Sequence, residues 1–230
     1  MQTNKNHILR ETTAIGGHKW IYEDLLRRLA DADIATSAQH LGLAMNDAEE
    51  VDVPFLGATY LISKRGARRT DGKRLSYATG SALIHYILKG SRSRPNGSFV
   101  TLSELAGPLF KQGSFSHSAL EQPIIKRFQG RILELLSKAA VLGGYQGGEA
   151  GLGGVSLIFV LLPHIPLQLI FYDRDEEFPA RATLLFSLNA TELIDFEVLA
   201  VLVTVFVQSL TGMNCNENLR LKKHGKWAES

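Results

Sequence analysis

Apolar positions are most concentrated between residues 152 and 210. Val155 to Leu162 is almost continuously apolar, and residues 167–172 contain a single polar position, Gln168. A short turn with two prolines, residues 163–166, separates these runs and holds His164. Two β-rich apolar runs joined by a short turn predict a β-hairpin, and continuous apolarity predicts a strand that is buried on both faces. A third β-rich run follows at 181–186.

Helical spacing of apolar residues occurs in four other places. Residues 20–43 show it with a break near Asp31 and Asp33, which predicts two short helices. Residues 77–89 form an apolar stripe that ends at Gly90, a natural C-cap. Residues 118–142 predict one long helix. Residues 195–210 are apolar almost all the way round, which predicts a helix buried on several sides, with Asp195 as a candidate cap.

These elements together predict an α+β fold. We expect an antiparallel sheet built from the segments near 53–62, 155–162, 167–173 and 181–186. Helices near 77–89, 118–142 and 195–210 would pack against it. We expect one domain over residues 19–212, preceded by a flexible arm (residues 1–18) and followed by a basic flexible tail (residues 213–230).

Composition narrows the classes of function. The chain has 230 residues, of which 45% are hydrophobic and 21% charged, as in an ordinary globular protein. One cysteine is too few for a disulfide or an iron–sulfur cluster held by this chain alone. No apolar run is long enough to cross a membrane, and the N-terminus lacks the apolar region of a signal peptide. We therefore expect a cytoplasmic protein with no membrane partner.

A basic stretch follows residues 51–62 and contains Asp71-Gly72, a tight-turn signal that predicts a hairpin tip. Its cations could grip phosphates, but no aromatic platform or recognition helix accompanies them. The net charge of +2 also gives little attraction to nucleic acid. A solvated loop is the favoured interpretation, and nucleic acid is not an expected partner. The cations are Lys64, Arg65, Arg68, Arg69, Lys73 and Arg74.

A glycine-rich segment, residues 143–154, invites comparison with phosphate-binding loops. Such loops follow a strand and begin a helix, so that the phosphate meets the helix N-terminus. Here a predicted helix comes first and a predicted strand comes second. The order favours a flexible connection, with a lid over a pocket as the alternative.

Four carboxylates crowd into the nine residues between the second and third β-rich runs, and three explanations stay open for them. The segment is a solvated turn whose acids pair with Arg174 and Arg181, a binding site with Phe178 as an apolar wall, or a site for a hard cation or an acid/base pair. On an extended chain alternate acids would share one face. The candidate ligand-binding residues are Asp173, Asp175, Glu176, Glu177, Phe178 and Arg181.

The sequences around this segment resemble an uncharacterised prokaryotic domain family. The resemblance rests on Leu-Pro-His-Ile-Pro-Leu, on Tyr-Asp-Arg-Asp-Glu-Glu-Phe-Pro-Ala-Arg-Ala, on Leu-Leu-Phe and on the acid-headed helix at 195–210. It covers residues 20–210 and is most specific over 160–205. That family occurs mainly in anaerobes, sometimes fused or adjacent to iron–sulfur modules of the corrinoid-protein type. The resemblance therefore implies an iron–sulfur or corrinoid protein as partner, with any cluster supplied by that partner.

Two functions follow as hypotheses. The leading one is a non-catalytic module that binds a cofactor or a partner protein in anaerobic redox or corrinoid-linked metabolism, with Phe178 packed inward and Arg181 engaged. The alternative is a small metal-dependent or acid/base enzyme that uses an acid of 173–177. No Gly-x-Ser-x-Gly, His-Glu-x-x-His or Cys-x-x-Cys motif occurs, and no metal ligands are assigned. The cofactor and the oligomeric state are not predicted.

Overall fold

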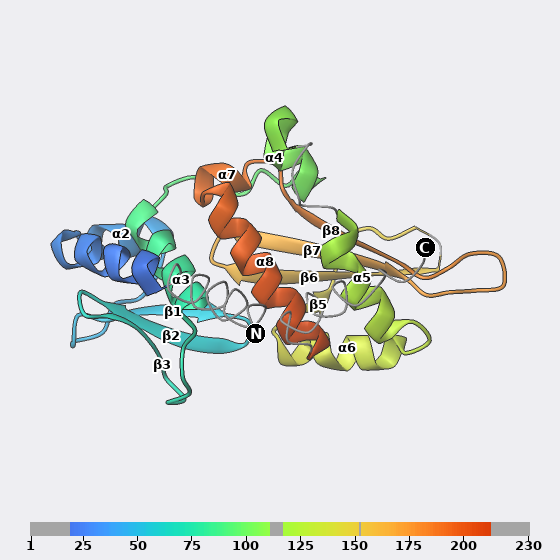
Figure 1. Cartoon of the computed structure of the whole chain (residues 1–230), viewed down its shortest axis with the longest axis horizontal. Coiled ribbons are helices and arrows are strands. Elements are labelled where there is room, and N and C mark those ends of the chain that lie inside the picture. The colour runs from blue at the N-terminus through green and yellow to red at the C-terminus, as the bar shows by residue number, and fades with distance from the viewer. Residues whose placement is uncertain (1–18, 111–116, 152, 213–230) are drawn as a thin grey trace, which may run out of the picture.

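Two antiparallel sheets and the helices packed on them make up the fold (Figure 1). The computed structural model describes residues 19–110, 117–151 and 153–212. The predicted arm, residues 1–18, and the predicted tail, residues 213–230, lie outside the described residues. The α+β class predicted from the sequence is confirmed, with the strands divided between a sheet of three and a sheet of five.

The three-stranded sheet has the order β1-β2-β3, with β1 at Val51–Phe55, β2 at Ala58–Ser63 and β3 at Gly66–Arg69. The segment near 53–62, predicted as one strand of the main sheet, is therefore a hairpin in a separate sheet. The chain reverses at Leu56 and Gly57, which both have positive φ, as a two-residue hairpin turn requires. The β2–β3 hairpin turns at residues 64–65, so the predicted tip at Asp71-Gly72 was wrong.

The five-stranded sheet has the order β4-β8-β7-β6-β5. Strands β6 (Gly154–Leu162), β7 (Ile165–Tyr172) and β8 (Arg181–Ser187) form a meander and correspond to the three predicted β-rich runs. The short strands β4 (Phe99–Thr101) and β5 (Tyr145–Gln146) complete its edges. Alternate residues of the meander are fully buried in rows across the sheet, such as Leu157, Leu169 and Leu184.

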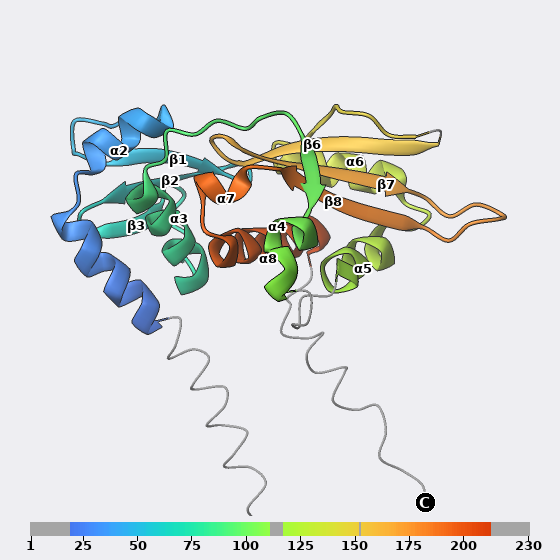
Figure 2. The same cartoon turned by 90° about the horizontal axis from the view of Figure 1, so that it is seen from above.

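The helices cover one face of the large sheet and pack beside the small one (Figures 1 and 2). Residues 19–31 are helical, and α2 (Ile34–Leu41) and α3 (Tyr77–Lys89) follow. The remaining helices are α4 (Leu102–Phe110), α5 (His117–Phe128), α6 (Ile132–Val141), α7 (Ala190–Leu193) and α8 (Phe196–Thr211). The long helix predicted at 118–142 is thus two helices. Among the described residues no helix has the length and apolar character needed to cross a membrane.

Helix α8 supplies the centre of the core, as its all-round apolar sequence predicts. Its buried residues include Phe206, whose ring meets the ring of Phe159 of β6 edge-on, with centroids 4.7 Å apart. Edge-to-face packing of this kind adds to the free energy gained from burying two large apolar side chains. Helices α3, α5 and α6 all contact α8, so this helix positions the rest of the helical layer.

The turn between β6 and β7 joins the large sheet to the first half of the chain. The Tyr86 hydroxyl of α3 donates to the Pro163 carbonyl at 2.6 Å. The ring of His164, which adopts a left-handed φ of 67°, places Nε2 3.1 Å from the Leu41 carbonyl at the end of α2. Burial raises the pKa of Tyr86 and lowers that of His164. Two turn residues therefore connect the sheet with two helices of the other half.

A second connection joins α3 to the beginning of α8. The Asp195 carboxylate lies 2.6 Å from Lys89 Nζ and 3.1 Å from His85 Nε2. Asp195 takes the N-cap position that the sequence suggested, but its carboxylate makes no capping bond because α3 engages it. Lys89 holds the pKa of Asp195 below its usual range. Burial lowers the pKa of His85 despite the neighbouring carboxylate, and its Nδ1 atom has no partner among the described residues.

Removing the Tyr86 hydroxyl tests the first connection. Tyr86→Phe leaves the Pro163 carbonyl without its donor, so we expect the free energy of unfolding to fall by about 1–2 kcal/mol. Chemical denaturation measures this change. Tyr145→Phe is the matched control, because that side chain is 56% exposed, and it should change stability by less than about 0.5 kcal/mol. Equal stability of the two variants would contradict the role of the buried bond.

The second connection predicts a pH dependence of stability. The folded protein disfavours protonated His85, whereas the unfolded chain takes up that proton near its ordinary pKa of about 6.5. The unfolded state therefore binds more protons as the pH drops, and stability falls from about pH 6.5 down through the lowered folded pKa. Urea unfolding at pH 7.5, 6.5 and 5.5 should show a shallower fall for His85→Gln than for the wild type. Parallel curves for the two proteins would rule out this histidine as a source.

Candidate functional site

The acidic segment singled out in the sequence is the connection between β7 and β8, which we call the acidic loop (residues 173–180). It extends beyond the end of the five-stranded sheet (Figure 2). Its base is fixed, because Asp173 Oδ1 accepts hydrogen bonds from the Gly130 amide at 2.7 Å and the Arg174 amide at 2.8 Å. The turn between α5 and α6 thereby holds the start of the loop.

Asp175 folds the rest of the loop. Its Oδ1 atom accepts from the backbone N–H groups of Glu177 at 2.9 Å and Phe178 at 2.7 Å. Its own N–H donates to the Phe178 carbonyl at 3.0 Å. An aspartate that bonds the backbone two and three residues ahead closes a local turn. Two of the four carboxylates are therefore used to shape the loop, and those of Glu176 and Glu177 are exposed.

The expectation that Phe178 packs inward was wrong, since its side chain is 65% exposed. Arg181 is exposed as well and forms no ion pair with another described residue. The buried rows of the sheet end at Phe171 and Ala182, and within the loop only Ala180 still belongs to the core, so residues 174–179 lie outside it. The turn closed by Asp175 also removes the extended geometry that would place alternate acids on one face. Whether these residues bind a ligand stays a prediction.

The part of the chain that the structure describes contains no cluster of ligands for a hard cation. No group of three His, Cys, Asp or Glu side chains lies close enough there to hold a metal ion. In the acidic loop, Asp173 and Asp175 accept hydrogen bonds from backbone amides, so their carboxylates are not gathered around a common point.

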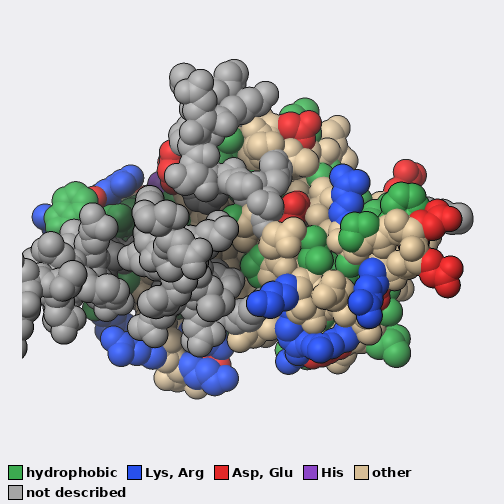
Figure 3. Space-filling view, turned by 45° about the vertical axis from the view of Figure 1, so that its right-hand side comes forward, with side chains coloured by type: hydrophobic (Ala, Val, Ile, Leu, Met, Phe, Trp, Pro, Cys, Tyr) green, Lys and Arg blue, Asp and Glu red, His purple; other side chains and the backbone are tan. Residues whose placement is uncertain are grey.

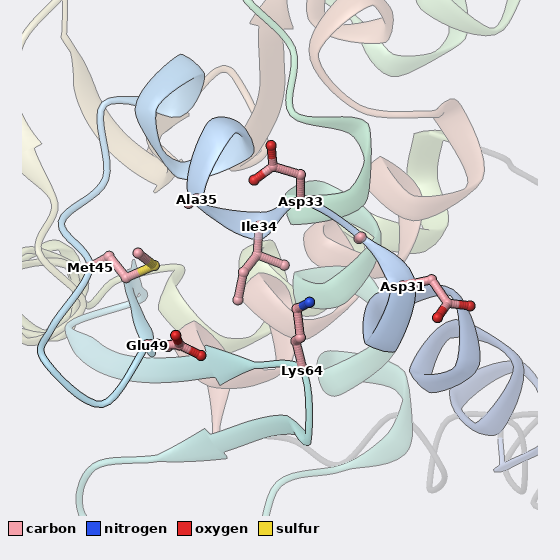
Figure 4. A pocket seen from close by; sticks show the side chains of 8 residues that line it. Asp31, Asp33, Ile34, Ala35, Met45, Glu49 and Lys64 are labelled. Atoms are coloured by element: carbon pink, nitrogen blue, oxygen red, sulfur yellow. The ribbon is translucent and has the colours of Figure 1, made fainter.

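A surface cavity of about 350 Å³ lies elsewhere, between the start of α2 and the β2–β3 turn (Figure 4). Lys64 points into it, whereas the carboxylate of Asp33 turns away and caps α2 through Thr36. The bonds from Thr36 lower the pKa of Asp33. The sequence marked Asp33 as part of a helix break and Lys64 as part of a basic loop, and no motif joined them. The lining residues are Asp31, Ala32, Asp33, Ile34, Ala35, Met45, Glu49 and Lys64.

The basic stretch is partly neutralised within the first half of the chain. Arg68 binds Glu50, with Nη2 2.7 Å from Oε2, and Arg69 binds Asp71, with Nη2 2.7 Å from Oδ2. These hydrogen bonds lower the pKa of both carboxyls. Lys73 Nζ also lies 3.6 Å from Asp71 Oδ2. Three of the six cations are thus paired inside the protein, which reduces the charge that this stretch offers to a phosphate.

Part of the glycine-rich segment, residues 147–151, lies against the outer face of the large sheet, opposite α8. The Gly151 amide donates to the Tyr172 hydroxyl at 2.9 Å, and Gln168 Nε2 donates to the Glu149 carbonyl at 3.2 Å. A Cβ atom on Gly148 would lie 2.6 Å from Gln168 Nε2. Close packing on the sheet therefore explains this glycine better than the flexible connection suggested by the sequence.

Comparison with known proteins gives one finding. The model of a family described as a domain of unknown function (DUF3786) matches residues 33–209, most of the span over which the sequence resemblance was noted. No curated protein and no solved structure matches the chain. The matched region runs from the beginning of α2 nearly to the end of α8 and contains both sheets and the acidic loop. On this match, which spans well over half of its length, the chain belongs to the DUF3786 family of domains of unknown function.

Proposed function

We propose that this chain is a non-catalytic module that binds another protein, and that the acidic loop is its docking element. The observation that carries the proposal is the exposure of Phe178 on a loop whose shape is already fixed. A large aromatic side chain in water gains free energy when a partner covers it, and aromatic residues dominate interface hot spots. The turn closed by Asp175 lowers the entropic cost of binding, because the loop is ordered before the partner arrives.

The surrounding charge indicates the chemistry of the partner. Glu176 and Glu177 lie beside Phe178 and are exposed. A partner surface with an apolar patch bordered by Lys or Arg would complement this arrangement and would be steered toward it over a distance of about 8–10 Å in physiological salt. An iron–sulfur or corrinoid protein, the partner class implied by the resemblance, is a candidate if it carries such a basic surface.

The geometry favours a protein partner over a small cofactor. Cofactor sites are concave and bury most of their ligand. The side chains from Asp175 to Phe178 instead face solvent at the far end of the molecule (Figure 2). The enzyme alternative gains no support from the loop, since two of its carboxylates accept backbone hydrogen bonds and the other two lie in solvent.

Photocrosslinking tests the proposal. A benzoylphenylalanine residue in place of Phe178, in cells that make the protein, should give a discrete adduct whose partner mass spectrometry identifies. The control is the same residue in place of Val160, which is 51% exposed on β6, far from the acidic loop along the strand. A yield at position 178 no higher than at position 160 would overturn the docking role.

Two loop variants sharpen the test once the adduct is known. Phe178→Ala should weaken binding about tenfold or more, as truncation of a hot spot does, while stability changes by less than about 0.5 kcal/mol. Asp175→Ala should weaken binding as well, because the turn loses its acceptor. Asp175→Asn keeps an acceptor oxygen and is the matched control. Binding that is unchanged in both alanine variants, measured by calorimetry, would contradict the role of a fixed loop.

A further inference from the structure

Helix α6 presents apolar side chains to solvent. Leu133 is 78% exposed and Val141 is 73% exposed, and they are eight positions apart, so both lie on one side of the helix. Between them the small residues Ser137 and Ala140 are also exposed. We call these four residues the α6 stripe. The other side of the helix buries Leu135 and Ala139 in the core, so α6 is apolar on two sides although only one is covered.

Basic side chains border the α6 stripe. Arg131 and Lys138 are exposed, and neither forms an ion pair with another residue in the described ranges. The carboxylate of Glu134 on the same helix is engaged by Arg127 of α5. The α6 stripe is therefore an apolar surface with unpaired positive charge beside it, which is the chemistry that the acidic loop requires of a partner.

The two surfaces lie at the same end of the molecule. The bond from the Gly130 amide to Asp173 ties the base of the acidic loop to the residue pair that precedes α6. Figures 1 and 2 both place the loop and α6 toward this end, and Figure 3 shows acidic side chains at the protruding tip with Lys and Arg side chains on the surface beside them. Phe178 does not pack on its own α6 stripe, because its side chain is 65% exposed.

We propose that the partner of the acidic loop is a second copy of this chain. The loop of one protomer docks on the α6 stripe of the other, with Phe178 against Leu133 and Val141 and the exposed glutamates against Arg131 and Lys138. A twofold axis repeats the contact, so that each protomer gives one loop and receives one. This inference rests on the proposed function and identifies the occupant by complementary charge, since the same chain carries both halves of the contact.

Sedimentation equilibrium of the full chain at low salt tests the pair. We expect dimers that dissociate as salt is added, because the charged border is screened. Phe178→Ala and Leu133→Asp should each weaken dimerisation about tenfold per contact, and about a hundredfold in all because a closed pair has two contacts. Val160→Ala is the control and should dimerise like the wild type. A wild-type chain that is monomeric at about 0.5 mM, which indicates a dissociation constant in the millimolar range or weaker, overturns the inference.

Mixing separates this arrangement from other dimers. Phe178→Ala keeps its α6 stripe and Leu133→Asp keeps its loop, so an equimolar mixture should regain one contact and form heterodimers. In a pair made by two α6 stripes, Phe178→Ala alone would dimerise like the wild type, which would overturn the loop-to-stripe contact.

Charge exchange gives an independent criterion. Glu176→Lys with Glu177→Lys, or Arg131→Glu with Lys138→Glu, should abolish the dimer, and the chain that carries all four changes should recover it. Failure of the fourfold variant to recover, with its fold intact by circular dichroism, counts against the pairing.

The crosslinking experiment distinguishes the two proposals. An adduct at position 178 with the mass of two chains supports the second copy. An adduct with a different protein, from a chain that is monomeric by sedimentation, overturns the second copy and leaves the docking role in place. Absence of any adduct above the control removes both.

Discussion

The structure depends on the burial of α8 against the inner face of the β6–β7–β8 meander. The helix brings Phe206 edge-on to Phe159 and is contacted by α3, α5 and α6, so the positions of three other helices follow from it. Burying an apolar side chain of this size contributes about 1.5–3 kcal/mol, and α8 buries a continuous series of them. The turn from β6 to β7 then connects this core of helix and sheet to the first half of the chain, through hydrogen bonds at Pro163 and His164.

The packing of α8 on the meander also determines the position and the exposure of the acidic loop and the α6 stripe. The sheet fixes where β7 ends and β8 begins, and the core stops at Phe171 on one strand and at Ala180 just before the other. Beyond that point Asp173 and Asp175 use their carboxylates on backbone amides, which leaves Phe178 and two glutamates to solvent. Helix α6 is held by Leu135 and Ala139, so its opposite side faces outward. The backbone of both surfaces is therefore held by the fold, and a backbone that is ordered before binding lowers the entropic cost of binding.

Local patterns in the sequence were sufficient for the elements that dominate the core. The runs at 155–162, 167–173 and 181–186 correspond to β6, β7 and β8, and the run at 195–210 corresponds to α8. The break at Gly130 was missed because apolar spacing continues through it. The hairpin at Leu56 and Gly57 was missed because β-formers flank the turn on both sides. Strands as short as β4 and β5 depend on pairing with distant residues, for which a single sequence has no local signal.

In the candidate site, too, some features have a local signal in the sequence and others depend on the whole fold. The sequence predicted that the acids of 173–177 lie in a connection between two strands. It did not predict that Phe178 is exposed, because that depends on where the sheet ends, which is a property of the whole fold. The α6 stripe could have been found from Leu133 and Val141, whose spacing sets them apart from the buried positions of the same helix. The surface cavity could not be found in this way, because Asp33 and Lys64 come to line one cavity only through the packing of α2 beside the β2–β3 turn.

The glycine-rich segment has an architectural consequence. Most open sheets hide their second face beneath another layer of helices or strands, which requires many additional residues. In this protein the main chain of residues 147–151 lies on part of that face, held by Tyr172 and Gln168, and it lies close to the sheet because Gly148 has no side chain that would meet Gln168. A few small residues thereby cover part of the outer face of the large sheet, where another protein would use a second layer of helices or strands.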